Sequence, residues 1–353
     1  MQEITIKEIL DATGGNLLCG DVCCKVTSVV TNSKEVRKGA LFVPIKGEKV
    51  DGHQFIPVAF SEGATAAFSE NKEITDDTKA LIFVSNTRDA LQSLAAYYRN
   101  QFEIPVIGVT GSVGKTSTKE MIAAALSEGG SVMKTAGNQN SQIGLPLTIF
   151  RLEKQHDMAV IEMGISEFSE MERLAKVAKV NRAVVTNIGV SHIENLKTKE
   201  NIRDQKLHII DYFNKGDTLY LNGSDPLLSS LRGRLSVPVV FYGLEEFCDY
   251  RAKNIETHEA FTSFILESKR YSGPVTIPAI GVHHVFNALA AIAVAFDVGL
   301  SIDQIKKGLL TYQTLAMRQQ VHRLKRVTVI DDSYNASPDS IKSGVGVLKA
   351  VQR

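Results

Sequence analysis

A chain of 353 residues with 44% apolar and 22% charged residues suits two or three soluble globular domains, which excludes a disordered or fibrous protein. Its 40 basic and 39 acidic residues give a formal net charge of +1, so neither nucleic acid nor an acidic membrane is an expected partner. The longest apolar run, residues 288–296, is shorter than the roughly 18 residues of a membrane-spanning helix, so no membrane insertion is expected.

The first residues and the cysteines favour a cytoplasmic protein. The opening MQEITIKEIL lacks the basic-then-apolar pattern of a secretory signal. Three of the four cysteines, Cys19, Cys23 and Cys24, crowd one segment, and Cys248 stands alone. Because no second pair or histidine cluster accompanies them, reduced structural thiols are favoured over a zinc site.

Residues 1–84 are predicted to form a small α/β domain. The expected elements are a strand and a helix ended by Gly14-Gly15, strands at 26–31 and 40–45, and a helix at 54–62. Polar turns occupy residues 32–39 and 51–53. Their Asn, Ser, Lys, Asp and His side chains suit a phosphorylated ligand, but a solvated loop is the simpler interpretation.

From residue 85 to about 314 the chain alternates strands and helices, which predicts an α/β domain with a mainly parallel sheet and helices on both faces. Helices are expected at 87–101, 201–212, 284–298 and 302–310, and strands at 106–109, 132–135, 158–163, 182–187, 218–222 and 237–242. Residues 250–278 alternate with period two and contain Gly273-Pro274, which predicts an antiparallel flap broken there. One more strand at 327–331 and a helix at 340–351 follow.

Residues 106–117, VIGVTGSVGKTS, carry the clearest chemical signal. A strand, a glycine turn at 111–114 and a helix at 115–126 come in the order of a phosphate-binding loop. In such a loop, backbone N–H groups and the helix N-terminus hold phosphates, a lysine adds charge, and a hydroxyl reaches magnesium. The general pattern has glycine where Val109 stands.

Polar residues at other strand ends are candidates for the same site, because ligands of doubly wound sheets bind beyond the carboxyl ends of the strands. Glu162 closes one strand, and a magnesium ion would pair a carboxylate that is otherwise costly there. Asn187 closes the next strand. His192, in the loop that follows, is explained equally well as a ligand or as an ordinary loop residue.

Three further segments keep two interpretations each. Lys206 lies in an expected helix, where a solvated lysine is the simpler interpretation. The loop 135–144 has amides that suit a sugar or phosphate, or a structural turn. Asp331 and Asp332 follow a strand and suit a ribose or metal, or a capped turn.

Together these segments resemble the Mur ligases, the ATP-dependent amino-acid and peptide ligases of bacterial cell-wall precursor synthesis. The family's phosphate loop, Thr-Gly-Ser/Thr-x-Gly-Lys-Thr, is matched by residues 110–116, so Val109 is a family feature. DDSYNASPDS at 331–340 is similar to the members that add D-alanyl-D-alanine to UDP-N-acetylmuramoyl-tripeptide. So are TNSKEVRKGALFVPIKGEKVDGHQFI, TAGNQNSQIGLPLTIF, VIEMGISEFSEM and VVTNIGVSHIENL. The resemblance extends over nearly the whole chain.

The resemblance implies a small uridine-binding domain, a central ATP-binding domain and a Rossmann-like third domain, with ATP and Mg²⁺ as cofactors. It assigns nucleotide binding to Thr110, Gly111, Ser112, Val113, Gly114, Lys115, Thr116, Ser117, Asn287, Arg318 and Asp332. It assigns catalysis to Lys115, Glu162, His192 and Lys206, and magnesium to Thr116, Glu162, His192 and Lys206. Lys206 matches a lysine that can be carbamylated, which requires a neutral amine and hence a lowered pKa.

The implied substrates are UDP-N-acetylmuramoyl-tripeptide and D-alanyl-D-alanine, joined through an acyl phosphate by a monomeric enzyme. The UDP end is assigned to Ser33, Lys34, Gly47, Asp51 and His53, and the muramoyl-peptide to Asn138 and Asn140. The departures from the family are Asn32 and Lys34 for Asp and Arg, His284, Ser141 and Ser337 for Asn, and His208 for Glu.

Residues 315–353 match only the beginning of the third domain. We therefore expect a truncated chain that binds ATP–magnesium and UDP-muramoyl-peptide but turns over poorly. Two alternatives stay open. One is a sister ligase with another acceptor, including the folate polyglutamylating enzymes, and the other is a non-catalytic nucleotide-binding module.

Overall fold

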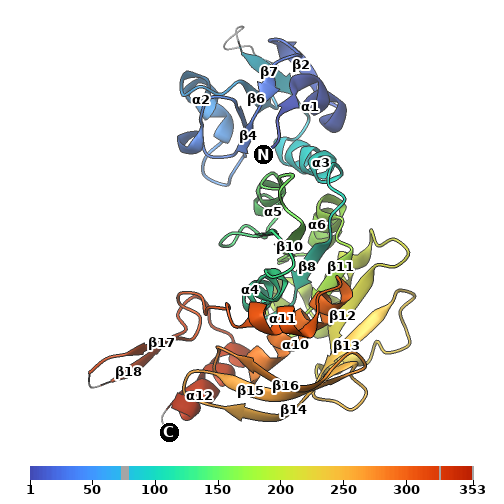
Figure 1. Ribbon diagram of the computed structural model, residues 1–353. Coiled ribbons are helices and arrows are strands. Elements are labelled where there is room, and N and C mark those ends of the chain that lie inside the picture. The colour runs from blue at the N-terminus through green and yellow to red at the C-terminus, as the bar shows by residue number, and fades with distance from the viewer. Residues whose placement is uncertain (73–78, 326, 352–353) are drawn as a thin grey trace. The chain divides into compact units, whose positions relative to one another are not determined.

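The computed structural model describes residues 1–72, 79–325 and 327–351, which form two compact units (Figure 1). The smaller unit consists of residues 1–103, 136–155 and 176–179, and the larger unit of residues 104–135, 156–175 and 180–353. Residues 73–78, 326, 352 and 353, which fall within the expected first and last domains, lie outside the described residues.

The smaller unit is built on a five-stranded sheet. Its strands, in spatial order, are β2 (Asn16–Cys19), β7 (Ala80–Phe83), β6 (Ala66–Ser69), β5 (Ala40–Phe42) and β4 (Ser28–Val30). The four strands from β7 to β4 pair in parallel, and β2 is antiparallel to β7. The other elements are β1 (Ile4–Thr5), β3 (Lys25–Val26), α1 (Ile6–Thr13), η1 (Ser33–Glu35), η2 (Gly52–Phe55), α2 (Ile56–Ser61), α3 (Thr87–Arg99) and α5 (Gly144–Ile149). The expected strand at 26–31 is therefore divided between β3 and β4, which belong to different sheets.

The larger unit contains a nine-stranded sheet. Its spatial order is β16 (Ser272–Ile277), β15 (Thr262–Ser268), β14 (Tyr250–Thr257), β13 (Val239–Gly243), β12 (Thr218–Asn222), β11 (Arg182–Val185), β8 (Val106–Thr110), β10 (Met158–Glu162) and β9 (Val132–Lys134). All pairs from β14 to β9 are parallel, which confirms the expected mainly parallel sheet.

The segment 250–278 continues this sheet, and the break expected at Gly273-Pro274 was wrong. Both residues lie inside β16, where Pro274 pairs with Ile265 of β15. Because β16 is an edge strand, it can carry a residue that has no N–H to give to a further strand. The turn between β15 and β16 comes earlier, at 269–271.

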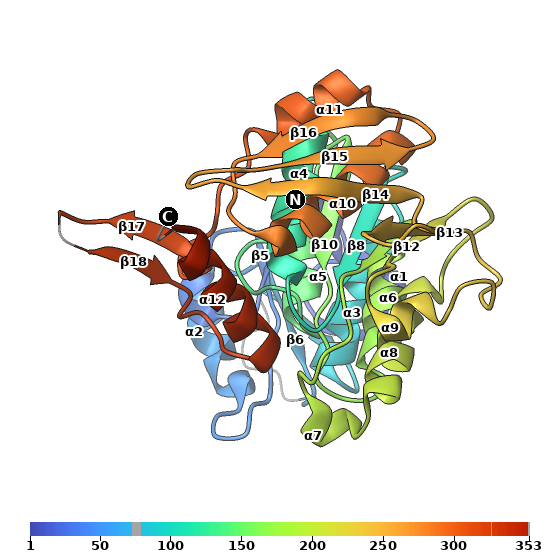
Figure 2. The ribbon, with the colours of Figure 1, turned by 90° about the horizontal axis from the view of Figure 1, so that it is seen from below.

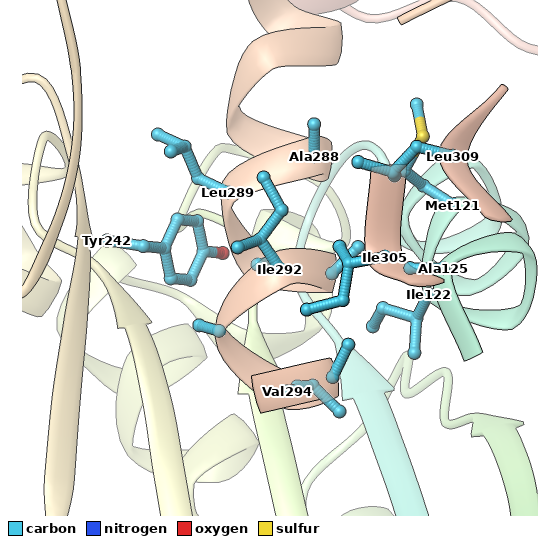
Figure 3. Close-up of a cluster of buried hydrophobic side chains, with 14 of the residues drawn as sticks. Met121, Ile122, Ala125, Tyr242, Ala288, Leu289, Ile292, Val294, Ile305 and Leu309 are labelled. Atoms are coloured by element: carbon cyan, nitrogen blue, oxygen red, sulfur yellow. The ribbon is translucent and has the colours of Figure 1, made fainter. Parts of the chain in front are cut away.

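Three helices cover one face of the large sheet: α4 (Lys115–Leu126), α10 (Val282–Asp297) and α11 (Ile302–Leu309). Figure 3 shows Met121 of α4, Ile292 of α10 and Ile305 of α11 in one apolar cluster. Ile107 and Val109 of β8 point into the same cluster. Gly108, between them, faces the other side, where Val180 and Ile209 lie so close that a Cβ would be crowded.

The remaining elements complete the larger unit, apart from the last residues of α6. They are α6 (Glu170–Ala178), α7 (Ile193–Leu196), α8 (Lys199–Leu207), η3 (His208–Ile210), α9 (Pro226–Ser229), the antiparallel pair β17 (Gln320–Arg323) and β18 (Thr328–Asp331), and α12 (Pro338–Val351). Figure 2 shows β17, β18 and α12 at the end of the chain. Among the described residues, no helix combines the length and apolarity needed to cross a membrane.

Candidate functional site

The strand order places β8 at the topological switch point of the large sheet. After β8 the chain builds β9 and β10 on one side and then continues with β11 on the other. The register puts Val109 of β8 opposite both Glu162 and Val184, so all three strands end at the same edge. In open α/β sheets, ligands bind in the crevice that opens where loops from such strands diverge.

Asn187, just beyond β11, fixes the phosphate loop from the neighbouring strand. Its backbone oxygen accepts a hydrogen bond from Ser112 N at 3.0 Å. Its side-chain Oδ1 accepts from Val113 N at 2.9 Å, and its Nδ2 donates to Val113 O at 2.8 Å. The hydroxyl of Thr186 donates to the same Val113 oxygen at 2.7 Å. The sequence marked Asn187 as a strand end but gave no sign of this role.

Two glycines give the loop its path. Gly111 has φ +148°, and a Cβ there would collide with the Thr186 hydroxyl. Gly114 has φ +84° and is the N-cap residue of α4, whose start has no side-chain cap in the described structure. N–H groups at an uncapped helix start attract anions. Within the described residues, the buried hydroxyls of Thr110 and Ser112 also have no hydrogen-bond partner, which suits a phosphate-binding loop.

Lys115 and Thr116 begin α4, as expected. The ammonium of Lys115 donates to Gly111 O at 2.9 Å and to Ser112 O at 3.4 Å, so it lies over the loop. Burial lowers its pKa, the carboxylate of Glu162 raises it, and Arg318 lowers it. Glu162 and Arg318 are therefore close enough to Lys115 for their charges to act on it, and these three residues define the charged neighbourhood of the loop. Thr116 is buried in the same first turn.

Lys206 and His192 belong to this neighbourhood too. Lys206 is only 2% exposed, which excludes the solvated lysine that its position in the sequence suggested. Burial lowers its pKa well below the ordinary value, and repulsion by Lys115 lowers it further. His192 adopts a left-handed backbone with φ 62°, uncommon outside glycine. Desolvation lowers its pKa, and the positive charges of Lys206 and Lys115 act in the same direction.

Glu162 is buried at the end of β10, beside a lysine that the sequence pattern did not single out. Lys119 Nζ lies 3.9 Å from Glu162 Oε2, and both side chains are almost fully buried. The signal was present in the sequence, because Lys119 follows Lys115 by four residues and must share its helix face.

Asn287 of α10 lies beside the start of α4. Its Oδ1 accepts from the Thr118 hydroxyl at 2.8 Å, and its Nδ2 faces His284 Nδ1 at 3.5 Å. Burial, and then His283, lower the pKa of His284 well below the ordinary value, so its Nδ1 can accept. The departure at His284 is therefore accommodated as a neutral imidazole.

Arg318 and Asp332 lie in the last part of the larger unit. The Arg318 guanidinium lies 4.0 Å from the ring centroid of Tyr334. Gln319 Nε2 donates to Asp332 Oδ2 at 3.4 Å. Burial raises the pKa of Tyr312, near the start of the segment that leads to Arg318, and Ser117 in the first turn of α4 acts in the opposite direction.

The seven residues expected to bind UDP-muramoyl-peptide all belong to the smaller unit: Ser33, Lys34, Gly47, Asp51, His53, Asn138 and Asn140. Asn32 caps η1 by accepting from Lys34 N at 3.1 Å. Gly47 N donates to Val50 O, and Asn140 N to Asn138 O, so both segments are compact turns.

Both ring nitrogens of His53 already bind the protein. Nε2 accepts from Glu70 N at 3.1 Å, so Nδ1 carries the proton and donates to Asp51 Oδ1 at 2.6 Å. Backbone and side-chain hydrogen bonds from His53 also lower the pKa of Asp51. His53 and Asp51 therefore shape this turn, and contact with a ligand stays a prediction for them.

The fold and site define a nucleotide-binding α/β protein with a phosphate loop at the switch point of its sheet. Comparison with known proteins shows to which family of nucleotide-binding proteins the chain is similar. The Mur ligase middle domain matches residues 109–295, and the Mur ligase family catalytic domain matches residues 25–99.

Individual relatives match almost the whole chain. The UDP-N-acetylmuramoyl-tripeptide--D-alanyl-D-alanine ligase of Bacillus subtilis is 35% identical over 351 residues, 99% of this chain and 76% of the relative. MurF from Acinetobacter baumannii has a TM-score of 0.94 at 30% identity, covering 99% of this chain and 77% of that one. MurF from Thermotoga maritima, solved in complex with ADP, has a TM-score of 0.84 at 33% identity, covering 92% and 74%. The chain belongs to the Mur ligase family.

Proposed function

We propose that the protein is an ATP-dependent ligase that adds D-alanyl-D-alanine to UDP-N-acetylmuramoyl-tripeptide in peptidoglycan precursor synthesis. The single observation that carries the proposal is the phosphate loop beside buried Glu162 and buried Lys206, whose pKa is lowered, in a chain that aligns over 99% of its length with a relative named for this reaction. A module that only binds nucleotide needs neither of these two buried ionisable groups.

The chemistry is activation of a carboxylate followed by transfer to an amine. The terminal carboxylate of the UDP-substrate attacks the γ-phosphorus of ATP, which forms an acyl phosphate and releases ADP. The amine of D-alanyl-D-alanine then attacks the acyl carbon, and the bond to phosphate breaks. The loop N–H groups and Lys115 bind and orient the phosphates, so most of the rate enhancement comes from positioning and charge neutralisation.

The protein side chains at the site suit an Mg²⁺ ion that the protein and the nucleotide bind together. Among the described residues, no group of three or more His, Cys, Asp or Glu side chains is placed to hold a metal. Mg²⁺ usually binds one or two protein oxygens together with phosphates and water, so a complete protein cage is not needed. Thr116, Glu162 and His192 are the proposed protein ligands, and the ion would supply charge neutralisation at the phosphates.

Lys206 is the proposed carbamate residue. Its burial and the repulsion from Lys115 favour the neutral amine that reacts with CO₂. Incubation with ¹³C-bicarbonate should give a carbamate carbon signal by NMR that disappears in Lys206→Met. A signal that persists in the variant would assign the carbamate to another lysine.

The two units support a division of labour. We propose that the smaller unit binds the UDP end and the muramoyl-peptide, because the residues expected to bind them lie in it, and that the larger unit, which contains the phosphate loop, binds ATP. Residues 315–353 would belong to the part of the protein that binds the incoming amine. A cytoplasmic location and a monomeric state complete the proposal, and light scattering after size-exclusion chromatography tests the latter.

The test is phosphate release with ATP, Mg²⁺, UDP-N-acetylmuramoyl-tripeptide and D-alanyl-D-alanine, omitting each in turn. Release should require all four, and mass spectrometry should show a product heavier by D-alanyl-D-alanine less water. Lys115→Met should abolish release, whereas Lys199→Met, which changes an exposed lysine of α8, should not. Equal release without D-alanyl-D-alanine, or transfer of glutamate to a folate, would refute the assignment.

A further inference from the structure

Lys119 is a fully buried lysine on the same face of α4 as Lys115. One turn separates the two, and only 1% of Lys119 is exposed. Its ammonium donates to Thr135 O at 2.7 Å and lies 3.1 Å from Glu120 Oε1. The third neighbour is Glu162 Oε2, at 3.9 Å. A buried ammonium is retained only where such partners compensate its lost hydration, so this position is built for a cation.

Thr135, directly after β9, links Lys119 to Glu162 by a second route. Its carbonyl oxygen accepts from Lys119, and its hydroxyl oxygen accepts from the backbone N–H of Glu162 at 2.9 Å. Lys119 therefore acts on Glu162 in two ways. It lies beside the Glu162 carboxylate, and it binds Thr135, whose hydroxyl binds the Glu162 backbone. The phosphate-loop helix, β9 and β10 are tied together at this point.

The charges around Lys119 decide whether it would help or oppose a cation at Glu162. A bare lysine would repel a divalent ion. Here Glu120 neutralises Lys119, and Lys134 forms an ion pair with the other oxygen of Glu120. Because Glu120 lies closer to Lys119 than Glu162 does, at 3.1 Å against 3.9 Å, it offsets much of the repulsion between Lys119 and a cation at Glu162, and the fixed orientation of Glu162 is the larger effect.

We propose that Lys119 is a positioning residue for magnesium–nucleotide binding, holding the Glu162 carboxylate and backbone in place at the end of β10. The inference rests on the proposed function, because it takes Glu162 as a ligand of the nucleotide-bound ion. Lys119 itself touches neither the ion nor the nucleotide in this proposal.

The test separates nucleotide affinity from its magnesium-dependent part. ADP binding is measured by isothermal titration in EDTA and in excess MgCl₂, and the ratio of the two affinities is the magnesium gain. Lys119→Met removes the charge at nearly constant length. The matched control is Lys134→Met, which removes a half-exposed lysine that pairs with Glu120 in the same ion-pair network.

Lys119→Met should lower the magnesium gain about tenfold, the scale of losing a group that orients a metal ligand, and change ADP affinity in EDTA by less than about twofold. Lys134→Met should leave the gain within about twofold of wild type. In a Glu162→Gln background, Lys119→Met should have no further effect, because the carboxylate on which it acts is gone. Mn²⁺ affinity in the presence of ADP, measured by EPR, should rank the variants in the same order.

An unchanged or higher gain in Lys119→Met, or effects of Lys119→Met and Glu162→Gln that multiply, would overturn the inference. If Lys119→Met does not fold, Thr135→Val is used instead, because it removes the acceptor of the Glu162 N–H. It should also lower the magnesium gain, and an unchanged gain in Thr135→Val would likewise overturn the inference. If the wild-type protein ligates D-alanyl-D-alanine but Lys119→Met keeps the full magnesium gain, only the role of Lys119 is refuted and the proposed function stands. A lost gain in a protein that ligates another amine contradicts the proposed acceptor alone.

Discussion

Replacing Asn187 by alanine should weaken nucleotide binding without touching any group that faces the nucleotide. The substitution removes the hydrogen bond that Val113 N donates to Oδ1 and the one that Nδ2 donates to Val113 O. The backbone bond from Ser112 N to Asn187 O can remain, because it does not involve the side chain. The loop would therefore lose part of its support while keeping its sequence.

The expected size follows from the two lost bonds. Each neutral hydrogen bond contributes about 0.5–1.5 kcal/mol, so the ordered loop should lose about 1–3 kcal/mol relative to disordered alternatives. Because binding must restore that order, ADP affinity should fall by about fivefold to about a hundredfold. The fall should be equal in EDTA and in MgCl₂, since Asn187 acts on the loop and not on the proposed metal ligands.

Isothermal titration of ADP in both buffers measures the effect, and urea denaturation checks the fold. The matched control is Asn195→Ala, which removes one side-chain bond to Ser166 O from a nearby exposed asparagine. ADP affinity within about twofold of wild type in a folded Asn187→Ala protein would refute the argument that this side chain orders the loop. A loss confined to the magnesium buffer would move its role to the metal.

Three further predictions use other features of the larger unit. Lys115→Ala should abolish measurable ADP binding and leave the urea midpoint nearly unchanged; normal titration heats would contradict it. Gly111→Ala places a Cβ against the Thr186 hydroxyl at a strained φ, so it should cost about 1–3 kcal/mol of unfolding free energy, and equal stability would exclude the collision. Burial lowers the pKa of His283 to about 4, so the unfolded chain gains a proton below about pH 6.5 that the folded chain takes up only near pH 4. Between pH 7 and pH 4.5, His283→Gln should therefore lose about 2–3 kcal/mol less stability than wild type in urea titrations, and parallel losses would show that His283 is not responsible.

Residues 106–126 are predictable from sequence because every local signal agrees. The β-branched strand, the glycine turn and the helical spacing point to the same structure, and the expected helix at 115–126 is confirmed as α4. The carboxyl-edge rule then brings Glu162 to the loop without any knowledge of distances, since parallel strands share an edge. Local agreement and sheet topology are therefore sufficient for the centre of the site.

Residues whose role depends on tertiary packing are harder to predict. Lys206 belongs to a polar helix, and only the packed structure shows that its ammonium is buried. Asn187 acts through a loop 74 positions away in the chain, a separation that no local pattern encodes. The short strand β6, with the sequence AAFS, has weak strand propensity; it is fully buried and pairs in parallel with β5 on one side and β7 on the other, which its local sequence does not reveal.

Pro274 has a consequence for the protein in a crowded solution. An exposed sheet edge is a template on which another chain can add a strand and start aggregation. The nine-stranded sheet ends at one side in β16, whose proline cannot donate to an incoming strand, and at the other in β9, which is only three residues long. A proline and a short strand thus keep the two edges of a large open sheet from serving as sites of intermolecular pairing.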